Sequence, residues 1–302
     1  MSFELKPQEQ VNRGLRRLVR KELRAARRAL DETHPPTPEG IHEARKSLKK
    51  VSAIVALIDA DDGRGVGRAE KRLSKIAGKL SRVRDADAMF EIVRKLHRSA
   101  PRLMDTQSMR ALRMWLSGQR SAALAAAGKK HRWQRLEDDL RALRRKAKRW
   151  QPSHRAFGAL SRGISDSLRR GKKALARATR RQRADDFHRW RKQIKSLWYE
   201  LRLVERAGAR VGRDVRALHR AETWLGDDHN VVVLCAALSR DGSGGTRPIS
   251  VEQLKAAADQ YHTRARRRAI TSVRHIYEQE SDQYLRELKR AWRVWQHRQQ
   301  AR

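Results

Sequence analysis

The segment Ile41–Ile58, IHEARKSLKKVSAIVALI, and a second segment about 146 residues later, Phe187–Val204, FHRWRKQIKSLWYELRLV, decide the fold of this chain. Both contain His-x-x-Arg-Lys-x-x-Lys. At about 100° per residue, an α-helix places these four residues within one arc of about 100° and the apolar residues, such as Trp190, on the core side. We call the two cationic faces the first basic stripe and the second basic stripe. They are His42, Arg45, Lys46 and Lys49, and His188, Arg191, Lys192 and Lys195.

Neither basic stripe has an acidic residue within it. Like charges one helical turn apart destabilise a helix by a few tenths of a kcal/mol per pair, whereas an ordinary solvated face mixes charges of both signs. A single basic stripe is usually a charged outer face in water. Two copies with the same residues in the same phase favour a binding face for an anionic ligand.

The net charge indicates a polyanionic partner. The 302-residue chain has 72 Lys and Arg against 34 Asp and Glu, a formal net charge of +38, and a sequence pI near 11.5. Its hydrophobic fraction of 39% is sufficient for a folded core, so the chain is not a disordered basic tail. The candidate partners are nucleic acid, an anionic membrane surface and a phosphate polymer.

The sequence also argues against several protein classes. Cys235 is the single cysteine, so neither a disulfide framework nor a cysteine-based zinc site is expected. Met1–Gln10 lacks an apolar signal core, and no uncharged stretch approaches the ~20 residues of a transmembrane helix. These features predict a soluble cytoplasmic protein that does not enter a membrane. We expect no cofactor and no metal ion.

Two more predicted helices carry basic stripes of their own. Val11–Leu30 has apolar residues on one side and arginines on the other, and Val66–Val83 repeats this arrangement. Tyr199 follows the second basic stripe by one turn and is predicted to line the binding cavity. The candidate ligand-binding residues outside the two stripes are Arg13, Arg17, Arg20, Arg24, Lys75, Lys79, Arg82 and Tyr199.

The second half of the chain repeats the plan of the first at an offset of about 145 residues. Leu80–Met89, LSRVRDADAM, aligns with Leu225–Leu234, LGDDHNVVVL, and a helix is expected to start within each. Ser250–Gln253 has capping-box spacing and predicts another helix start. No segment shows the period-2 alternation of a half-buried strand. The prediction is an all-α fold of two helical bundles, residues 1–152 and 153–302, related by a pseudo-twofold axis.

These segments resemble the CHAD family, the conserved-histidine α-helical domain. The likeness rests on both histidine motifs, the RVRDADAM and LGDDHNVVVL segments and the closing WRVW region, and it covers essentially the whole chain. The resemblance implies two four-helix bundles around a basic central cavity that binds inorganic polyphosphate, and an association with polyphosphate granules. It implies binding by both basic stripes together with Arg82, Arg84 and His229. Asn230 departs from the family, which usually has Asp there.

His42 and His188 could have several roles. A metal ligand would need a second histidine or cysteine one turn away, and a phosphate-accepting nucleophile would need an orienting carboxylate; neither stands at a suitable spacing. Both histidines fit best as hydrogen-bond donors to phosphate, with structural hydrogen bonding as the remaining alternative. Because histidine gains charge near neutral pH, we expect binding to strengthen from about pH 8 to about pH 6.

Three functions are in competition. The leading hypothesis is a non-catalytic polyphosphate-binding protein, cytoplasmic and located at polyphosphate granules or the nucleoid, which also accepts other polyanions and phosphate or sulfate ions. The second is a sequence-indifferent nucleic-acid-binding protein, although the chain has no zinc-finger, homeodomain or RRM signature. The third is a polyphosphate-metabolising enzyme with Mg²⁺ on aspartates, which we interpret instead as helix caps. These aspartates are Asp85, Asp87, Asp227 and Asp228.

Overall fold

The computed structural model describes residues 3–33, 36–62, 67–127, 130–147, 157–240 and 250–300. Within these ranges the chain forms helices and no strand, which confirms the predicted all-α class, and no helix there is long and apolar enough to cross a membrane. The helices are α1 (Val11–Asp31), α2 (Pro38–Asp62), α3 (Gly67–Lys79), α4 (Ser81–Ser99), α5 (Thr106–Ala127), α6 (Lys130–Ala147), α7 (Phe157–Arg181), α8 (Ala184–Arg202), η1 (Glu205–Ala207), α9 (Ala209–Arg240), α10 (Val251–Tyr277) and α11 (Ser281–Gln300).

Both motif helices bury the apolar faces that their spacing predicts. The predicted apolar residues from Ile41 to Ile58 in α2 and from Phe187 to Leu201 in α8 are at most 1% exposed. Trp190 is fully buried, so the prediction that it packs in the core is confirmed. Each large apolar side chain stabilises the fold by about 1.5–3 kcal/mol when buried. This burial orients both helices and leaves the basic stripes on the opposite side.

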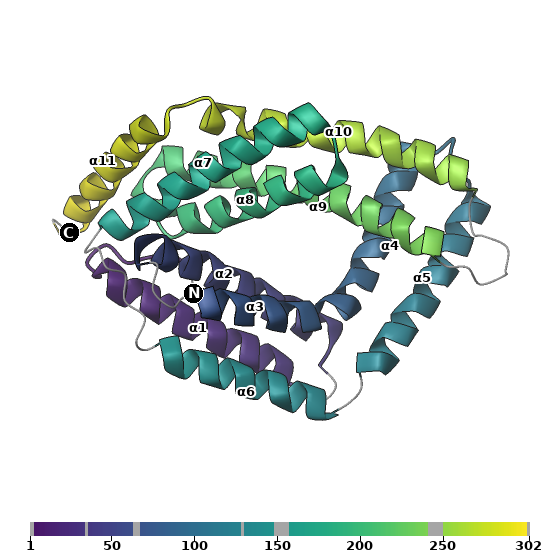
Figure 1. The fold of residues 1–302 in the computed structure, drawn as a ribbon, viewed down its shortest axis with the longest axis horizontal. Coiled ribbons are helices and arrows are strands. Elements are labelled where there is room, and N and C mark those ends of the chain that lie inside the picture. Colours follow the sequence, from purple (N-terminus) through teal and green to yellow (C-terminus); the bar gives the residue numbers. More distant parts are fainter. Residues whose placement is uncertain are drawn as a thin grey trace.

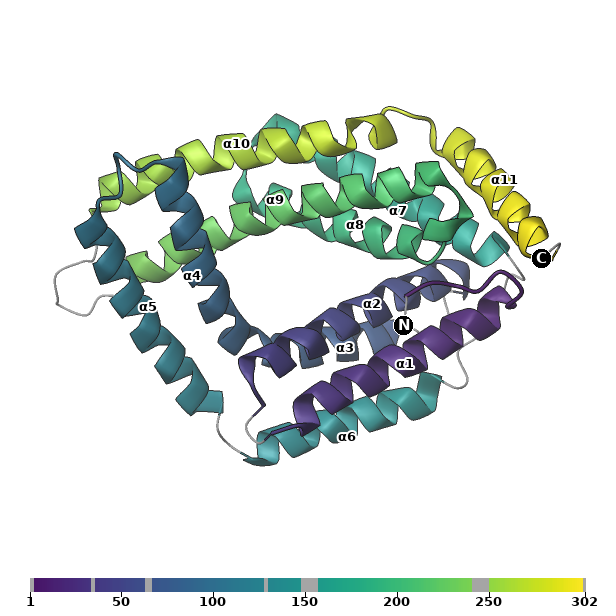
Figure 2. The ribbon, with the colours of Figure 1, turned by 180° about the vertical axis from the view of Figure 1, so that it is seen from behind.

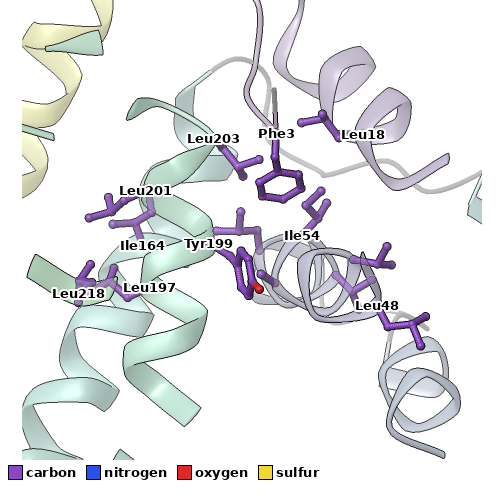
Figure 3. Packing of buried hydrophobic residues seen from close by; sticks show 14 of the residues in the cluster. Phe3, Leu18, Leu48, Ile54, Ile164, Leu197, Tyr199, Leu201, Leu203 and Leu218 are labelled. Carbon is purple, nitrogen blue, oxygen red and sulfur yellow. The ribbon is translucent and has the colours of Figure 1, made fainter. Parts of the chain in front are cut away.

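The two halves of the chain share their apolar cores. One cluster joins α1, α2, α3 and α6 to α7, α8 and the C-terminal helices, and the other joins α4 and α5 to α9 and α10. Figure 3 shows Phe3 packed between α2 and α8, near Ile54 and Leu203. The backbone N–H of Leu5 donates to the Leu203 carbonyl at 2.9 Å. The expected boundary at Gln151–His154 lies outside the described residues, so the division into 1–152 and 153–302 stays a prediction.

Four helices form a closed ring of contacts. Helix α2 contacts α8, α8 contacts α9, α9 contacts α4, and α4 contacts α2. Figures 1 and 2 show from opposite sides that α2 and α3 lie along one edge of this ring and α8 and α9 along the other, with α4 connecting them. The two basic stripes are therefore carried by helices on opposite edges of one ring, and these helices touch at one end.

Two helix boundaries differ from the prediction. Helix α9 runs unbroken through Leu225–Leu234, where a helix start was expected, because Leu225, Val231 and Leu234 continue its buried face. In the first half, the chain breaks at Leu80 and α4 begins at Ser81. Arg82 consequently belongs to α4 and not to the helix before it.

Candidate functional site

The two basic stripes meet where α2 contacts α8. Lys49 of α2 lies beside Arg191 and Lys195 of α8. Glu222 of α9 lies within this group: Nη2 of Arg191 donates to Oε1 of Glu222 at 2.9 Å, and Nζ of Lys195 donates to the same oxygen. We call Lys49, Arg191, Lys195 and Glu222 the central cluster.

The central cluster has more positive than negative charge in a poorly solvated place. Burial and, to a smaller extent, the nearby charges of Lys195, Arg45 and Arg191 together lower the pKa of Lys49 to about 7. Burial also lowers the pKa of Lys195, while Glu222 acts in the opposite direction. For the Glu222 carboxyl, burial alone would raise the pKa, but Lys195 and Arg191 bring it below its usual value. The cluster would therefore be stabilised by additional negative charge.

A glycine of α9 lets Arg191 lie against the helix backbone. A Cβ at Gly226 would be 3.0 Å from Nη2 of Arg191, which is tighter than an ordinary contact. The Arg191 side chain is 23% exposed, and its buried Nε has no hydrogen-bond partner in the structure. A buried donor without a partner is unfavourable by about 1–3 kcal/mol. The guanidinium therefore retains unused capacity to donate to an anion.

The histidine of the second basic stripe pairs with a histidine of α9. The ring centroids of His188 and His229 are 4.1 Å apart, and the rings are 34° from parallel. Burial lowers the pKa of His188 to about 4, and His229 and the exposed Lys192 contribute to this shift. The prediction that His188 gains charge between pH 8 and pH 6 is therefore wrong for the unbound protein. The family resemblance implied that His229 belongs to the site, and the structure places it beside His188 of the second basic stripe.

The first basic stripe runs from an exposed end to a buried end. His42 and Lys46 are exposed, while Arg45 and Lys49 are partly buried. Nη1 of Arg45 donates to the carbonyl oxygen of Ala77 at 2.9 Å, which holds the guanidinium beside the end of α3. The stripe thus leads along α2 from solvent to the central cluster.

The predicted arginines of the first helix line a separate groove. This groove of about 1270 Å³ follows α1 and the first turns of α2, and none of the stripe residues lines it. Nη2 of Arg17 donates to Oε2 of Glu9 at 2.6 Å, whereas Arg13, Arg20 and Arg24 have no ion-pair partner among the described residues. We call it the α1 groove. Its basic residues are Arg13, Arg16, Arg17, Arg20, Lys21, Arg24 and Arg28.

Tyr199 packs in the core, so the prediction that it lines the binding cavity is wrong. It extends the second basic stripe by one turn, to the place where α2 covers α8, and it is 3% exposed. Its ring meets the Phe3 ring edge-on with the centroids 6.1 Å apart (Figure 3). The second basic stripe therefore ends where α2 packs against α8, because the next residue on that face, Tyr199, is buried in the core.

Of the basic residues predicted around α3, Lys75 and Lys79 are not part of the central cluster. Lys79 faces α6, where its Nζ is 3.8 Å from Oδ2 of Asp139, and Lys75 is exposed on α3. The side chains of Arg82 and Arg84 fall outside the described residues. The predicted contacts of these four residues with the ligand therefore stay predictions.

Two of the four aspartates considered as Mg²⁺ ligands or helix caps, Asp227 and Asp228, connect α9 to other helices. Lys95 donates to Oδ2 of Asp227 at 2.8 Å, and Arg266 donates through Nε to Oδ1 of Asp228 at 2.9 Å. Both aspartates lie inside α9, so their interpretation as caps is wrong. Among the described residues, no group of three or more His, Cys, Asp or Glu side chains could hold a metal ion. For the other two aspartates, Asp85 and Asp87, the side chains lie outside the described part of the structure.

Glu222 is the site residue that the sequence interpretation missed. It stands seven residues before His229, which is about two turns on the same face of an α-helix. This spacing could have placed both residues beside the second basic stripe. Because a helix start was expected within Leu225–Leu234, Glu222 and His229 were assigned to different helices, and their common face was not recognised.

Comparisons with known proteins agree with the fold. A model of the CHAD domain matches residues 17–239. The crystal structure of the CHAD domain from the plant Ricinus communis has a TM-score of 0.58 and 18% identity, over 97% of this chain and 95% of that chain. PptA from Streptomyces chartreusis has a TM-score of 0.60 and 17% identity, over 86% of this chain and 98% of that chain. Comparison with curated proteins gave no match.

Proposed function

This chain belongs to the CHAD domain family, and from that premise we propose that it binds inorganic polyphosphate without altering it chemically. The observation that supports the proposal is the central cluster, where three cationic side chains from two helices surround one carboxylate. Holding such charges together out of water is unfavourable unless an anion compensates them. A phosphate polymer brings closely spaced negative charges without bases that would need recognition.

The donors of the central cluster suit phosphate oxygens. Arg191 presents a planar guanidinium that can donate to two oxygens, while Lys49 and Lys195 are compact charges. Because the pKa of Lys49 is about 7 in the unbound protein, an approaching polyanion would drive it to full protonation. The cluster then gains positive charge at the place where the ligand binds.

We place the polymer along both basic stripes, with the central cluster between them. The exposed residues of α2 and α8 would contact the chain as it leaves the cluster, and the α1 groove would hold a further length of polymer. The proposed contacts are His42, Arg45, Lys46, Lys49, His188, Arg191, Lys192, Lys195 and His229, with Arg13, Arg17, Arg20 and Arg24 in the α1 groove.

We assign the protein to the cytoplasm and to polyphosphate granules, where the polymer is most concentrated. Its net charge of +38 favours accumulation on any dense polyanion. Fluorescence microscopy of the tagged chain should therefore show foci that coincide with a polyphosphate stain. Foci that coincide with the nucleoid would favour the nucleic-acid hypothesis.

Competition between polyanions tests the proposed function. Protein bound to labelled DNA is titrated with long-chain polyphosphate and with unlabelled DNA, both measured as phosphate concentration. We expect polyphosphate to displace the labelled DNA at the lower concentration, and the reverse order would identify nucleic acid as the ligand. Prolonged incubation of polyphosphate with the protein and Mg²⁺ should release no orthophosphate, whereas release would identify an enzyme.

A further inference from the structure

Glu222 occupies the position that an anionic ligand of the second basic stripe would need. Its Oε1 accepts hydrogen bonds from both Arg191, at 2.9 Å, and Lys195. The Glu222 side chain is 11% exposed, and it lies under two cations that are themselves mostly buried. A phosphate oxygen bound to this pair would use the same two donors, so the carboxylate and the ligand compete for one place.

The charges around Glu222 explain why a carboxylate stands in a site for anions. Lys49, Arg191 and Lys195 together have up to three positive charges, and Glu222 supplies one negative charge among them. Without that charge, three poorly solvated cations would face one another in the unbound protein, which is strongly unfavourable. Glu222 therefore stabilises the empty site, and it does so at the expense of ligand binding.

We infer that Glu222 is an internal competitor of the ligand, which neutralises the central cluster in the unbound protein and is displaced when polyphosphate binds. The inference rests on the proposed function and adds selectivity for chain length to it. A short phosphate makes too few contacts to replace the carboxylate. A long chain holds the exposed residues of both stripes at the same time, so it displaces Glu222 as one step among many contacts.

The substitution Glu222→Gln removes the negative charge with little change of shape. Glu43→Gln is the matched control: Glu43 also pairs with a stripe lysine, Lys46, at 3.3 Å, but both side chains are about half exposed, so water screens the pair and its loss should matter little. General electrostatics would strengthen binding equally in both variants. By calorimetric titration we expect E222Q to bind tripolyphosphate about tenfold more tightly than the wild type, and E43Q to differ by less than about twofold. Equal effects of the two substitutions would overturn the inference.

Thermal unfolding provides a second readout. Without ligand, E222Q should unfold at a lower temperature than the wild type, because the three cations lose their shared partner. Tripolyphosphate should then raise the unfolding temperature of E222Q more than that of the wild type. A smaller or equal rise in E222Q would also overturn the inference.

A milder variant keeps the test open if E222Q does not fold. Glu222→Asp retains the charge but withdraws the carboxylate by one methylene group, so it should bind tripolyphosphate more tightly than the wild type by a smaller factor. Unchanged affinity of E222D would overturn the inference. If the wild type itself fails to bind long-chain polyphosphate, the proposed function fails; if it binds while E222Q behaves like E43Q, the competitor role of Glu222 alone fails.

Discussion

Replacing Lys49 with methionine should make the protein more stable and should weaken its binding of polyphosphate. Lys49 lies beside two other cations in the central cluster, where burial opposes its charge. Methionine has a similar unbranched shape and no charge, so it fills the space without the electrostatic penalty. Opposite effects on stability and binding are expected of a residue retained for its function.

The magnitude follows from the pKa of Lys49. This pKa is about 7 in the folded protein, against 10.5 for a solvated lysine. Between these two values the unfolded chain binds a proton that the folded protein does not, so stability falls as the pH decreases from 10.5 to 7. The destabilisation is about 4 kcal/mol at pH 7 and about 2 kcal/mol at pH 9.

Guanidinium chloride unfolding, followed by circular dichroism at both pH values, measures this effect. K49M should exceed the wild type in free energy of unfolding by about 4 kcal/mol at pH 7 and by about half as much at pH 9, and it should bind polyphosphate about tenfold more weakly. Lys46→Met, at an exposed position of the same helix, should change stability by less than about 0.5 kcal/mol. A K49M protein no more stable than the wild type, or an advantage equal at both pH values, would refute the reasoning.

The remaining predictions concern the ligand. Arg191→Gln should weaken polyphosphate binding about tenfold, whereas Arg189→Gln, at a 56% exposed position of α8, should weaken it less than about twofold; equal losses would show that only net charge matters. Affinity should rise as the pH decreases from about 9 to 7, because Lys49, with its pKa of about 7 when unbound, takes up a proton in the complex. It should rise again below about pH 6, because bound phosphate raises the pKa of His188 from about 4. Calorimetry in two buffers of different ionisation enthalpy counts these protons. An affinity that does not change between about pH 9 and pH 5 would contradict both assignments. Affinity should also decrease with salt, by about 0.7–0.9 log units per phosphate contact for each tenfold increase, and a flat dependence would exclude binding through the stripes.

The helices and their buried faces were predictable because they depend on residues close together in the chain. The apolar spacing of Ile41–Ile58 and Phe187–Val204 determines which side of each helix enters the core, whatever the neighbouring helix is. The helix start predicted at Ser250 is confirmed in the same way, since its side chain accepts from the backbone N–H of Gln253 at 3.1 Å and caps α10. Local geometry sufficed for these features.

The missing parts of the site depend on where distant helices touch. Glu222 and Gly226 reach Arg191 only because α9 is continuous and packs along α8. Tyr199 is buried because α2 covers that turn of α8, and the low pKa of His188 depends on burial and on His229. Apart from the seven-residue spacing of Glu222 and His229, no local pattern in the sequence indicates these contacts, so the stripes were predictable while their charge balance was not.

A crystal structure of the protein with long-chain polyphosphate tests most directly whether the polymer binds where α2 meets α8. We predict phosphate oxygens within hydrogen-bond distance of Arg191 and Lys195, with the Glu222 carboxylate turned away from both. A polymer confined to the α1 groove, with Glu222 still accepting from Arg191 and Lys195, would contradict this account.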